Sequence, residues 1–447
     1  MSKNASTPSV YSDRIPLEIE YLNPDQIRPY EKNAKRHPDR QIAEIAESIA
    51  RNGFTNPVLI DADGVIIAGH GRYAAAGKLG LTKIPCIRLT RLTPSQVRAY
   101  RLADNKLAEK ASWDEDILRL EFEAMRIEGI ELETTGFETV EIDILFEDEK
   151  GEPSDPLEDQ PPPEGPSVTR PGDLWLLGDH RLLCADATDP ASYGQLMQGE
   201  QARMVFTDPP YNVPIQGHVS GLGKVQHREF AMASGEMSRD EFTAFLASVF
   251  GNLAKNSVDG SIHYVFMDWR HMGEVLVAGE AEFSELKNLI VWAKDNGGMG
   301  AFYRSRHELC FVFKRGTAPH RNNFGLGAGG RYRTNVWNYR GVNTFSADRM
   351  DELALHPTVK PAAMVADAIM DVSARGDIVL DPFSGSGTTL IAAERTARRA
   401  RMMELDPVYC DRAIRRWQAY AHDEAVHAET GLTLDELAQS RVEQEAN

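Results

Sequence analysis

Hydrophobic positions follow two different patterns along the chain, separated by a polar segment at residues 148–171. Before this segment, apolar residues recur at helical spacing in DRQIAEIAESIARNG and gather in short runs elsewhere. The pattern predicts a helix, two strands joined by an Asp-Gly turn, a third strand and then acidic helices, at residues 39–53, 57–69, 83–89 and 94–147. We therefore expect a small α+β domain at 15–147 that ends in an acidic helical extension, with a flexible tail at 1–14.

After residue 171, apolar strands alternate with amphipathic helices. The expected strands are LWLLGDHRLLCAD, MVFTD, SIHYVFMD, LIVWAK, LCFVFK, IVLDPF and ARMMELD, and the expected helices are RDEFTAFLASVFGNLAK, PAAMVADAIMDVSA and TTLIAAERT. This alternation predicts an α/β sheet with helices on both faces, at residues 172–422. A polar helical tail at 423–447 is expected to begin at a capping box formed by Thr433 and Glu436.

The segment between the two patterns is rich in proline and acidic residues and contains almost nothing apolar. It cannot form a core, so residues 148–171 are interpreted as a linker. Charge is also uneven: residues 109–164 hold 20 acids and 4 bases, whereas residues 287–349 hold 11 bases and 3 acids. The overall charge of −18 therefore does not exclude a nucleic-acid partner, because the local field steers a polyanion.

Length, cysteine spacing and the absence of long apolar runs indicate the number of domains and the type of protein. A chain of 447 residues suits two or three domains. The four cysteines lie far apart and form no C-x-x-C pair, which suits a reduced cytoplasm, and no disulfide framework or metal site is expected. No apolar run is long enough to cross a bilayer, and the N-terminus has no apolar signal segment. We expect a cytoplasmic protein without a membrane partner.

The stretch IVLDPFSGSGTTL predicts a ligand-binding loop. An apolar strand runs into Asp381, a loop with Gly385 and Gly387 follows, and a helix begins near Thr388. Glu404 ends the next strand. Its separation from the glycines along the sequence is the one at which a doubly wound fold places an acid that binds ribose hydroxyls. The acid at the ribose position predicts a ligand that contains an adenosine. Because no lysine follows the glycines as in a P-loop, this ligand need not carry a phosphate. A plain tight turn is the alternative.

The stretch FTDPPYN places an acid at the carboxyl end of an apolar strand, where α/β sheets bind ligands. Pro209 and Pro210 restrict the backbone and so orient Asp208 and the neighbouring carbonyls, while Tyr211 offers a flat face. Rigid acceptors beside an aromatic ring suit the exocyclic amine of a planar base. By accepting hydrogen bonds from the amine, they favour the more electron-rich nitrogen that forms during nucleophilic attack. Stacking offsets part of the cost of taking the base out of a duplex. The alternative is an Asp-Pro turn that ends a strand.

These motifs carry a resemblance to a known family. Residues 172–420 resemble the beta group of DNA amino-methyltransferases, which use S-adenosylmethionine: DPPY at 208–211 is similar to their catalytic motif and FSGSG at 383–387 to their cofactor loop. The catalytic half precedes the cofactor half, as in that group. HPTVKP at 356–361 and RSRHELCFVFKRG at 304–316 also resemble segments of the group.

The resemblance implies a Rossmann-like methyltransferase fold with permuted motif order, and roles for individual residues. It implies that Asp208 and the carbonyl of Pro209, in the Pro209–Pro210 pair, accept from the target amine, and that Tyr211 stacks on the flipped base. The residues it implies at the cofactor are Asp186 at the adenine, Glu404 at the ribose, Lys360 near the methionine carboxylate, and Asp381, Phe383, Ser384, Gly385, Gly387 and Thr388 in the loop.

The implied activity is methyl transfer from S-adenosylmethionine to adenine N6 at a specific site in double-stranded DNA, as in restriction-modification. Cytosine N4 is the alternative base. DNA contacts are expected from Arg331, Arg333, Trp337 and Arg340, in a target-recognition region at about 314–355; a solvated loop is the alternative. The segment 213–230 either closes over DNA or forms an unstructured loop.

The first domain resembles the ParB/sulfiredoxin-like fold in GVIIAGHGRYAAAGKLGLTKIPCIRL at 64–89. Gly69, Gly71 and Arg72 match that family's nucleotide-phosphate loop, and LADNKL at 102–107 is also similar. His70 stands where sulfiredoxins need a cysteine, so their chemistry is not expected. Nucleotide binding and a DNA-docking or partner-docking role stay open for this domain.

Two other functions are weighed against DNA methylation. One is methylation of RNA or of protein amides, and the other is a ParB-type nucleotide-dependent DNA-binding adaptor with an inactive methylase domain. Intact Asp208, Tyr211, Gly385 and Glu404 count against the adaptor. The recognised DNA sequence and a partner nuclease are not defined by the sequence, and a homodimer is left open.

Overall fold

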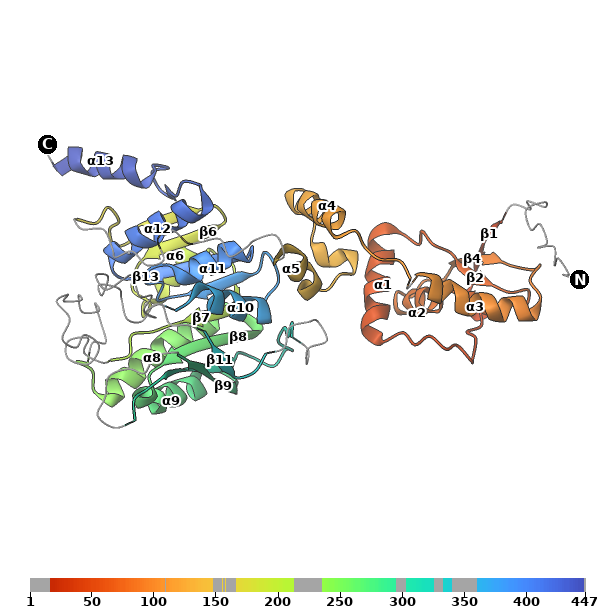
Figure 1. Cartoon of the computed structure of the whole chain (residues 1–447), viewed down its shortest axis with the longest axis horizontal. Coiled ribbons are helices and arrows are strands. Elements are labelled where there is room, and N and C mark those ends of the chain that lie inside the picture. The colour runs from red at the N-terminus through yellow and green to blue at the C-terminus, as the bar shows by residue number, and fades with distance from the viewer. Residues whose placement is uncertain are drawn as a thin grey trace, which may run out of the picture. The chain divides into compact units, whose positions relative to one another are not determined.

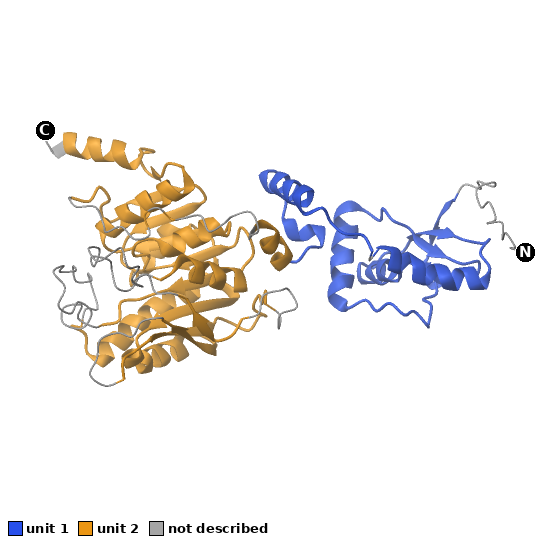
Figure 2. Ribbon diagram, in the orientation of Figure 1, with its two compact units in different colours: residues 1–138 blue, residues 139–447 orange. Residues whose placement is uncertain are grey.

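The computed structural model describes residues 17–108, 110–147, 155, 157, 166–212, 235–294, 303–324, 333–339 and 360–445. They divide into two compact units, residues 1–138 and 139–447 (Figures 1 and 2). The predicted tail at 1–14, the segment 213–230, most of the linker, and Arg331 and Arg340 lie outside the described residues.

The first unit contains a four-stranded sheet in the order β1-β4-β2-β3 within its described part. Its elements are β1 (Ile19–Leu22), η1 (Pro24–Gln26), α1 (Asp39–Asn52), β2 (Val58–Ile60), β3 (Ile66–Ala68), α2 (His70–Lys78), β4 (Ile84–Arg88), α3 (Pro94–Ala108), α4 (Glu115–Ile127) and η2 (Leu132–Thr135). α1 ends where predicted, because Gly53 adopts a φ of 81° and its N–H bonds the carbonyl of Ile49. A small apolar core of strand residues and Ala76 supports this α+β arrangement.

The described part of the second unit contains a ten-stranded sheet in the order β11-β9-β10-β8-β7-β12-β13-β6-β5-β14. β9, β8, β7, β12, β13 and β6 run parallel to one another, and β10 is inserted antiparallel between β9 and β8. The strands are β5 (Leu174–Leu177), β6 (His180–Cys184), β7 (Ala202–Thr207), β8 (Ser257–Met267), β9 (Glu285–Ala293), β10 (His307–Lys314), β11 (Val336–Asn338), β12 (Ile378–Asp381), β13 (Arg399–Glu404) and β14 (Val426–His427).

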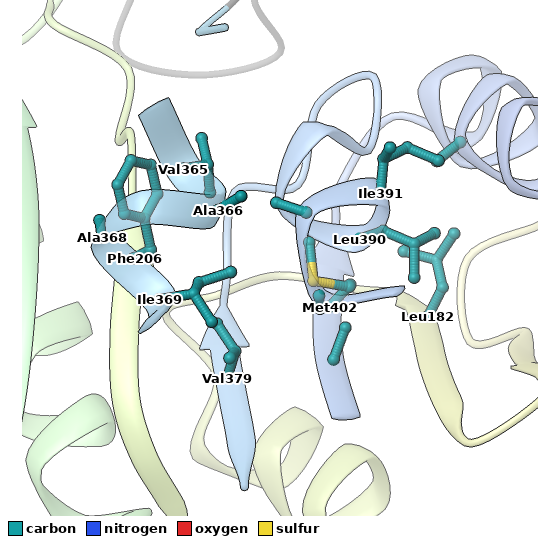
Figure 3. Close-up of a cluster of buried hydrophobic side chains, with 14 of the residues drawn as sticks. Leu182, Phe206, Val365, Ala366, Ala368, Ile369, Val379, Leu390, Ile391 and Met402 are labelled. Carbon is teal, nitrogen blue, oxygen red and sulfur yellow. The ribbon is translucent and has the colours of Figure 1, made fainter. Parts of the chain in front are cut away.

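Helices cover both faces of this sheet, as predicted. One face packs against α10 (Ala362–Val372), α11 (Thr388–Arg395) and α12 (Pro407–Ala421), and part of this core is shown in Figure 3. The other face packs against α6 (Pro190–Met197), α8 (Arg239–Lys255) and α9 (Met272–Glu282). Along β7, Phe206 enters the first core and Val205 the second, which is the alternation expected for a strand buried on both sides. The predicted Rossmann-like α/β fold is confirmed.

Several elements of the second unit were not predicted: α6, α9, α12 and the edge strands β11 and β14. β14 pairs with β5, so residues after 422 extend the sheet before α13 (Leu434–Glu445) begins. The predicted capping box at the start of α13 is present, since the N–H of Thr433 donates to Glu436 at 2.9 Å and the N–H of Glu436 donates back to the Thr433 hydroxyl at 3.4 Å. The prediction of a purely helical tail at 423–447 therefore changes to a short strand followed by a helix.

Helix α5 (Thr139–Glu147) belongs to the second unit, whereas the sequence placed it at the end of the first domain. Its carboxylate Asp143 receives two N–H groups of Arg398, at 2.9 and 2.8 Å, and both side chains are buried. Arg375 adds a third bond at 3.3 Å. This buried ion pair, together with the apolar residues Val140, Ile142 and Leu145, fixes α5 to the second unit.

Among the described residues, no helix combines the length and apolar character needed to span a membrane.

Candidate active site

The carboxyl ends of four neighbouring parallel strands bring the predicted site residues to one edge of the sheet. Asp208 follows β7, Asp381 ends β12, Glu404 ends β13, and Asp186 lies two residues beyond β6. β7 and β12 pair directly, with Met204 opposite Val379 and Val205 opposite Leu380. The DPPY motif and the glycine loop, about 175 residues apart in the chain, therefore occupy adjacent strand ends, as the sequence predicted.

Asp208 is the accessible end of a buried polar cluster. The Tyr211 hydroxyl lies 2.6 Å from Asp208 Oδ1 and 3.1 Å from Glu308 Oε2. Lys360 Nζ donates to Asp208 Oδ2, and it also lies 3.0 Å from Glu308 Oε2. Lys294 donates to the other oxygen of Glu308. The side chain of Asp208 is 25% exposed, against 5% for Lys360 and 11% for Glu308.

Two carboxylates and two ammonium groups balance the charge of this cluster. Burial raises the pKa of Asp208, and the Lys360 ammonium opposes that shift. Burial alone would raise the pKa of Glu308 as well, but Lys360 and Lys294 lower it to about 2. Burial alone would lower the pKa of Lys360, but the two carboxylates raise it. Glu308 is therefore a permanent anion that holds Lys360 charged beside Asp208.

Glu308 and Lys294 were not predicted from the sequence, and the contacts of Lys360 with Asp208 and Glu308 were not predicted either. Lys360 Nζ lies in the Asp208 cluster, and its expected place near the methionine end of the cofactor stays a prediction. The available signal for Glu308 was a carboxylate at the start of the otherwise apolar strand HELCFVF. Its partners Lys294 and Lys360 lie just after β9 and just before α10, and strand pairing between distant segments is not visible in one sequence.

The rest of the DPPYN stretch shapes this edge. Pro209 is buried and Pro210 is half-buried. Asn212 adopts a φ of 51°, and its side chain donates to the carbonyl of Met237 at 2.8 Å and accepts from the N–H of Gly235 at 3.0 Å. The asparagine thus anchors the segment that leads into α8.

The glycine loop after β12 combines one packing glycine with one open glycine. A Cβ built on Gly387, at a φ of 84°, would lie 2.9 Å from the Cβ of Ala413 on α12, so this glycine permits close helix packing. Gly385 has a φ of 52°, and no described atom lies within 4 Å of a Cβ built there. The space in front of Gly385 is therefore free to receive a ligand.

Glu404 and Ser384 present polar groups to the same loop. Glu404 Oε2 accepts from the N–H of Gly385 at 2.8 Å and Oε1 accepts from the N–H of Asp406 at 2.9 Å, which fixes the carboxylate beside the open glycine. The buried hydroxyl of Ser384 has no hydrogen-bond partner within the described part of the chain. A fixed carboxylate, an orphaned buried hydroxyl and an open glycine fit a ligand that carries hydroxyl groups.

The back of the loop is held by Arg416 of α12. Its Nη1 lies 3.1 Å from the carbonyl of Ser386 and 3.1 Å from the Thr388 hydroxyl. Its Nε donates at 2.7 Å to Asp155, a residue of the predicted linker. Arg416 is completely buried, and its ion pair with Asp155 connects the loop to the segment interpreted as a linker.

Asp381 and Asp186 bond to groups of the loops that follow their strands. Asp381 accepts from the N–H of Phe383 at 3.0 Å and from the Thr389 hydroxyl at 2.7 Å. Asp186 accepts from both the N–H and the hydroxyl of Thr188, at 2.8 Å each. Phe383 is half-buried and its ring centroid lies 6.1 Å from that of Phe245. In this structure Asp381 shapes the start of the loop.

Asp381 leads to a prediction about stability and pH. Burial raises its pKa from 3.8 to about 7. A carboxyl whose folded-state pKa is raised contributes stability that is fully present below its unfolded pKa and is lost as pH rises toward its folded pKa. Between pH 4 and 7, we expect the free energy of unfolding of the wild type to fall relative to that of Asp381→Asn, by up to about 1.4 kcal/mol per pH unit.

Urea titrations at several pH values, followed by tryptophan fluorescence, measure this difference. Five of the six tryptophans lie in the second unit, so the signal reports mainly on that unit. Parallel pH curves for the two proteins would contradict the role assigned to Asp381.

Two residues that the sequence predicts at DNA, Arg333 and Trp337, make contacts within the protein. Arg333 Nε donates to Asp371 at 3.0 Å, and its Nη1 donates to Asp367 at 3.1 Å and to the Tyr339 hydroxyl at 2.6 Å. Trp337 is 4% exposed and lies in β11, the edge strand. These contacts stabilise the edge of the sheet, and the expected role of the two residues at DNA stays a prediction.

The predicted nucleotide loop of the first unit opens α2. Gly69 adopts a φ of 99° and is the N-cap of that helix. Arg72 donates to the carbonyls of Asn56 and Pro57 at 2.6 and 3.1 Å. His70 Nε2 accepts from the N–H of Tyr30 at 3.3 Å, and burial lowers the pKa of this histidine to about 4. A Cβ on Gly71 would lie 2.9 Å from the Cδ1 of Ile45, so a side chain at this position would displace the end of Ile45 on α1.

A basic cleft of about 480 Å³ lies next to this loop. It is lined by residues of the loop after η1 and of α3, including the predicted LADNKL segment: Tyr30, Lys32, Asn33, Ala34, Lys35, Arg98, Arg101, Leu102, Asn105 and Lys106. Five of these residues are basic and none is acidic. Gly69, His70, Gly71 and Arg72 do not line it, but Tyr30, which does, donates its backbone N–H to His70.

Comparison with known proteins finds relatives for both the N-terminal and the C-terminal part of the chain. Three family models match: a DNA methylase at residues 202–415, a ParB-methyltransferase HTH domain at 116–171 and a ParB N-terminal domain at 11–106. The HTH model spans the acidic helices and the segment interpreted as a linker, and a domain there was not predicted.

Individual relatives match one half or the other. The ParB-like nuclease domain-containing protein YnaK of Escherichia coli K12 is 48% identical over 80 residues, which is 18% of this chain and 92% of that protein. The Type II methyltransferase M2.MboI of Moraxella bovis is 27% identical over 234 residues, which is 49% of this chain and 82% of that protein. The crystal structure of M1.HpyAVI aligns with 53% of this chain and 96% of its own at 20% identity, with a TM-score of 0.38.

Proposed function

This chain carries a DNA methylase domain of the N6/N4 type and a ParB N-terminal domain, and on that premise we propose that it methylates adenine N6 in double-stranded DNA. S-adenosylmethionine is the proposed methyl donor. One observation carries the proposal: β7 and β12 are adjacent and parallel, so Asp208 and the loop at Gly385 share one edge of the sheet. A target amine at Asp208 and a cofactor at Gly385 would then be neighbours.

Residues in and beside the glycine loop fit this cofactor. Glu404, fixed by two backbone N–H groups, is placed to accept from ribose hydroxyls. The Ser384 hydroxyl and the space before Gly385 supply a polar contact and room for the nucleoside. When bound, S-adenosylmethionine supplies a methyl group on a sulfonium that a nucleophile can attack directly.

The Asp208 cluster then acts on the amine. Each carboxylate oxygen of Asp208 holds one protein donor, Tyr211 or Lys360, and has a second lone pair for an amine N–H. Accepting that bond, with the carbonyl of Pro209, raises the electron density on the nitrogen. After transfer the methylated nitrogen must lose one proton, and Asp208, whose pKa burial raises, is the proposed acceptor. Tyr211 is proposed to stack on the flipped base, which offsets part of the cost of unstacking.

Adenine is proposed over cytosine because the acidic form of the motif, DPPY, resembles that of adenine-specific members. Tritiated methyl transfer to unmethylated duplex DNA, followed by digestion to nucleosides, identifies the product. N6-methyladenine is the expected nucleoside. N4-methylcytosine would overturn the choice of base, and methylation of RNA but not DNA would overturn the proposal itself.

The basic cleft favours a second activity, binding of a nucleoside triphosphate by the first unit. Five basic residues around about 480 Å³ suit a triphosphate, and the adjoining helix α2 begins at the predicted phosphate loop. Calorimetric titration of the full-length protein with the four ribonucleoside triphosphates, and with Arg98→Glu as the comparison, tests this activity. Saturable binding that the variant loses is expected, whereas equal heats for both proteins would exclude the cleft as the site.

A further inference from the structure

A short turn after β8 exposes a tryptophan and an arginine at the same sheet edge as Asp208. Trp269 is 49% exposed, and 54% of the Arg270 side chain is exposed. The Arg270 guanidinium lies over the Trp269 ring, 5.1 Å from its centroid. Neither residue contributes to the buried core, and the roles proposed above do not use them.

The turn is held in place by its neighbours. Asp268 accepts from the N–H of Arg270 at 2.9 Å and also receives its guanidinium at 3.1 Å. His271 packs edge-on against Phe242, with 5.1 Å between ring centroids, and its Nδ1 lies 3.4 Å from Glu274. An exposed aromatic ring on a fixed turn loses little conformational freedom when it binds a partner.

Strand register places this turn beside the Asp208 cluster. Thr207 of β7 pairs with Val265 of β8, so β8 and the turn continue past the level at which Asp208 leaves the sheet. On the other side, Leu309 of β10 pairs with Met267, so Glu308 stands next to the start of the turn. The turn therefore borders the cluster that contains Asp208.

The start of β10 adds more groups of the same kind to this edge. Tyr303 is 88% exposed, and Arg304 and Arg306 are exposed as well. Arg306 donates from Nε and Nη2 to the carbonyl of Lys294, at 3.1 and 3.0 Å, which ties this segment to the end of β9. Together Trp269, Arg270, Tyr303, Arg304 and Arg306 define a surface that we call the aromatic-basic edge.

We propose that the aromatic-basic edge binds the DNA that flanks the target base, with Trp269 stacking on a nucleobase and Arg270 contacting a phosphate. The inference rests on the proposed function, because DNA whose target amine reaches Asp208 must pass over neighbouring strand ends. Aromatic rings interleaved with arginines on a surface suit unstacked bases and phosphates. The three arginines outweigh the partly exposed carboxylate of Asp268 in the turn, which suits a polyanion.

The test compares two double variants of the full-length protein. Trp269→Ala/Arg270→Ala removes the turn's two side chains. Leu286→Ala/Lys287→Ala is the matched control: an exposed apolar residue beside a cation, at the opposite end of β9, where Lys287 pairs with Glu285 at 3.0 Å. Binding to a fluorescein-labelled duplex is measured by anisotropy over a range of salt concentrations, and methyl transfer to unmethylated plasmid DNA is measured in parallel.

The turn variant is expected to bind DNA about tenfold more weakly, and its salt dependence should fall by about one unit of slope. Trp269→Phe should recover most of the affinity. The control variant should match the wild type, and all variants should keep the melting temperature and the affinity for S-adenosylmethionine. Unchanged DNA affinity in the turn variant would overturn the inference.

The two proposals fail in different ways. A wild type that binds DNA through the turn but transfers no methyl group would reject the proposed function and keep the interface. A wild type that transfers methyl groups, with full efficiency retained in the turn variant, would reject the interface and keep the function.

Discussion

Replacing Asp208 by alanine should lower kcat for methyl transfer by about 10²–10³-fold, while the affinity for S-adenosylmethionine stays within a few fold. Asp208 is the accessible member of the buried cluster, and its oxygens are the proposed acceptors for the target amine. The variant should still fold, because Lys360 keeps its contact with Glu308 at 3.0 Å and is not left as an unpaired buried charge. Single-turnover transfer of a tritiated methyl group measures the chemical step directly.

Two variants make this result interpretable. Asp208→Asn keeps the shape and one acceptor oxygen, so its activity should lie between those of the wild type and the alanine variant. Asp259→Ala removes an exposed carboxylate from β8 near the opposite edge of the sheet and should leave kcat unchanged. Retention of full activity by Asp208→Ala would remove Asp208 from the mechanism, and loss of cofactor binding would indicate a disturbed fold.

Replacing Gly385 by valine should abolish cofactor binding, with an increase in Kd of at least about 100-fold, as expected when ligand atoms are displaced from a built pocket. The Cβ and methyl groups would fill the space in front of the loop, where no described atom now lies within 4 Å. The cost to folding should be modest, because a Cβ at this position has no atom beyond its chain neighbours within 4 Å and the left-handed φ of 52° is unfavourable by about 1–2 kcal/mol. Calorimetric titration with S-adenosylmethionine gives the Kd.

Gly376 provides a matched control for backbone strain. It has a φ of 82° and, like Gly385, no described atom within 4 Å of a built Cβ, but it precedes β12 instead of following it. Gly376→Val should therefore lose similar stability and keep the affinity for the cofactor. Equal loss of binding in both variants would mean that strain, and not occupation of the pocket, explains the effect.

The arrangement of the site followed from the sequence wherever apolar runs ended on a polar residue. IVLD and MVFTD are both strands buried on two faces, and parallel strands in an α/β sheet bring their carboxyl ends together, so the shared edge of Asp208 and Asp381 could be inferred from the residues alone. The glycines predicted the loop because they let a ligand approach the backbone, and the structure adds that Gly387 permits packing of α11 against α12.

Residues whose partners lie far away in the chain could not be predicted in this way. Glu308 and Lys294 read as ordinary ends of two apolar strands, and their charge pairing depends on the antiparallel insertion of β10 next to β9. The partners of Arg333 could not be predicted either: it lies in a glycine-rich basic segment, and the structure pairs it with Asp367 and Asp371 on α10. Charge counted along a sequence does not show which cations are already paired.

The ion pair between α5 and the methylase core restricts how such proteins can exchange modules. A gene fusion that joined a different N-terminal domain at residue 148, where the composition changes, would discard Asp143 and leave Arg398, which is fully buried, without its counter-ion. Loss of one partner of a buried pair costs about 3–5 kcal/mol, a large part of the stability of a typical domain. Successful recombination, in evolution or in the laboratory, should therefore cross over before residue 139.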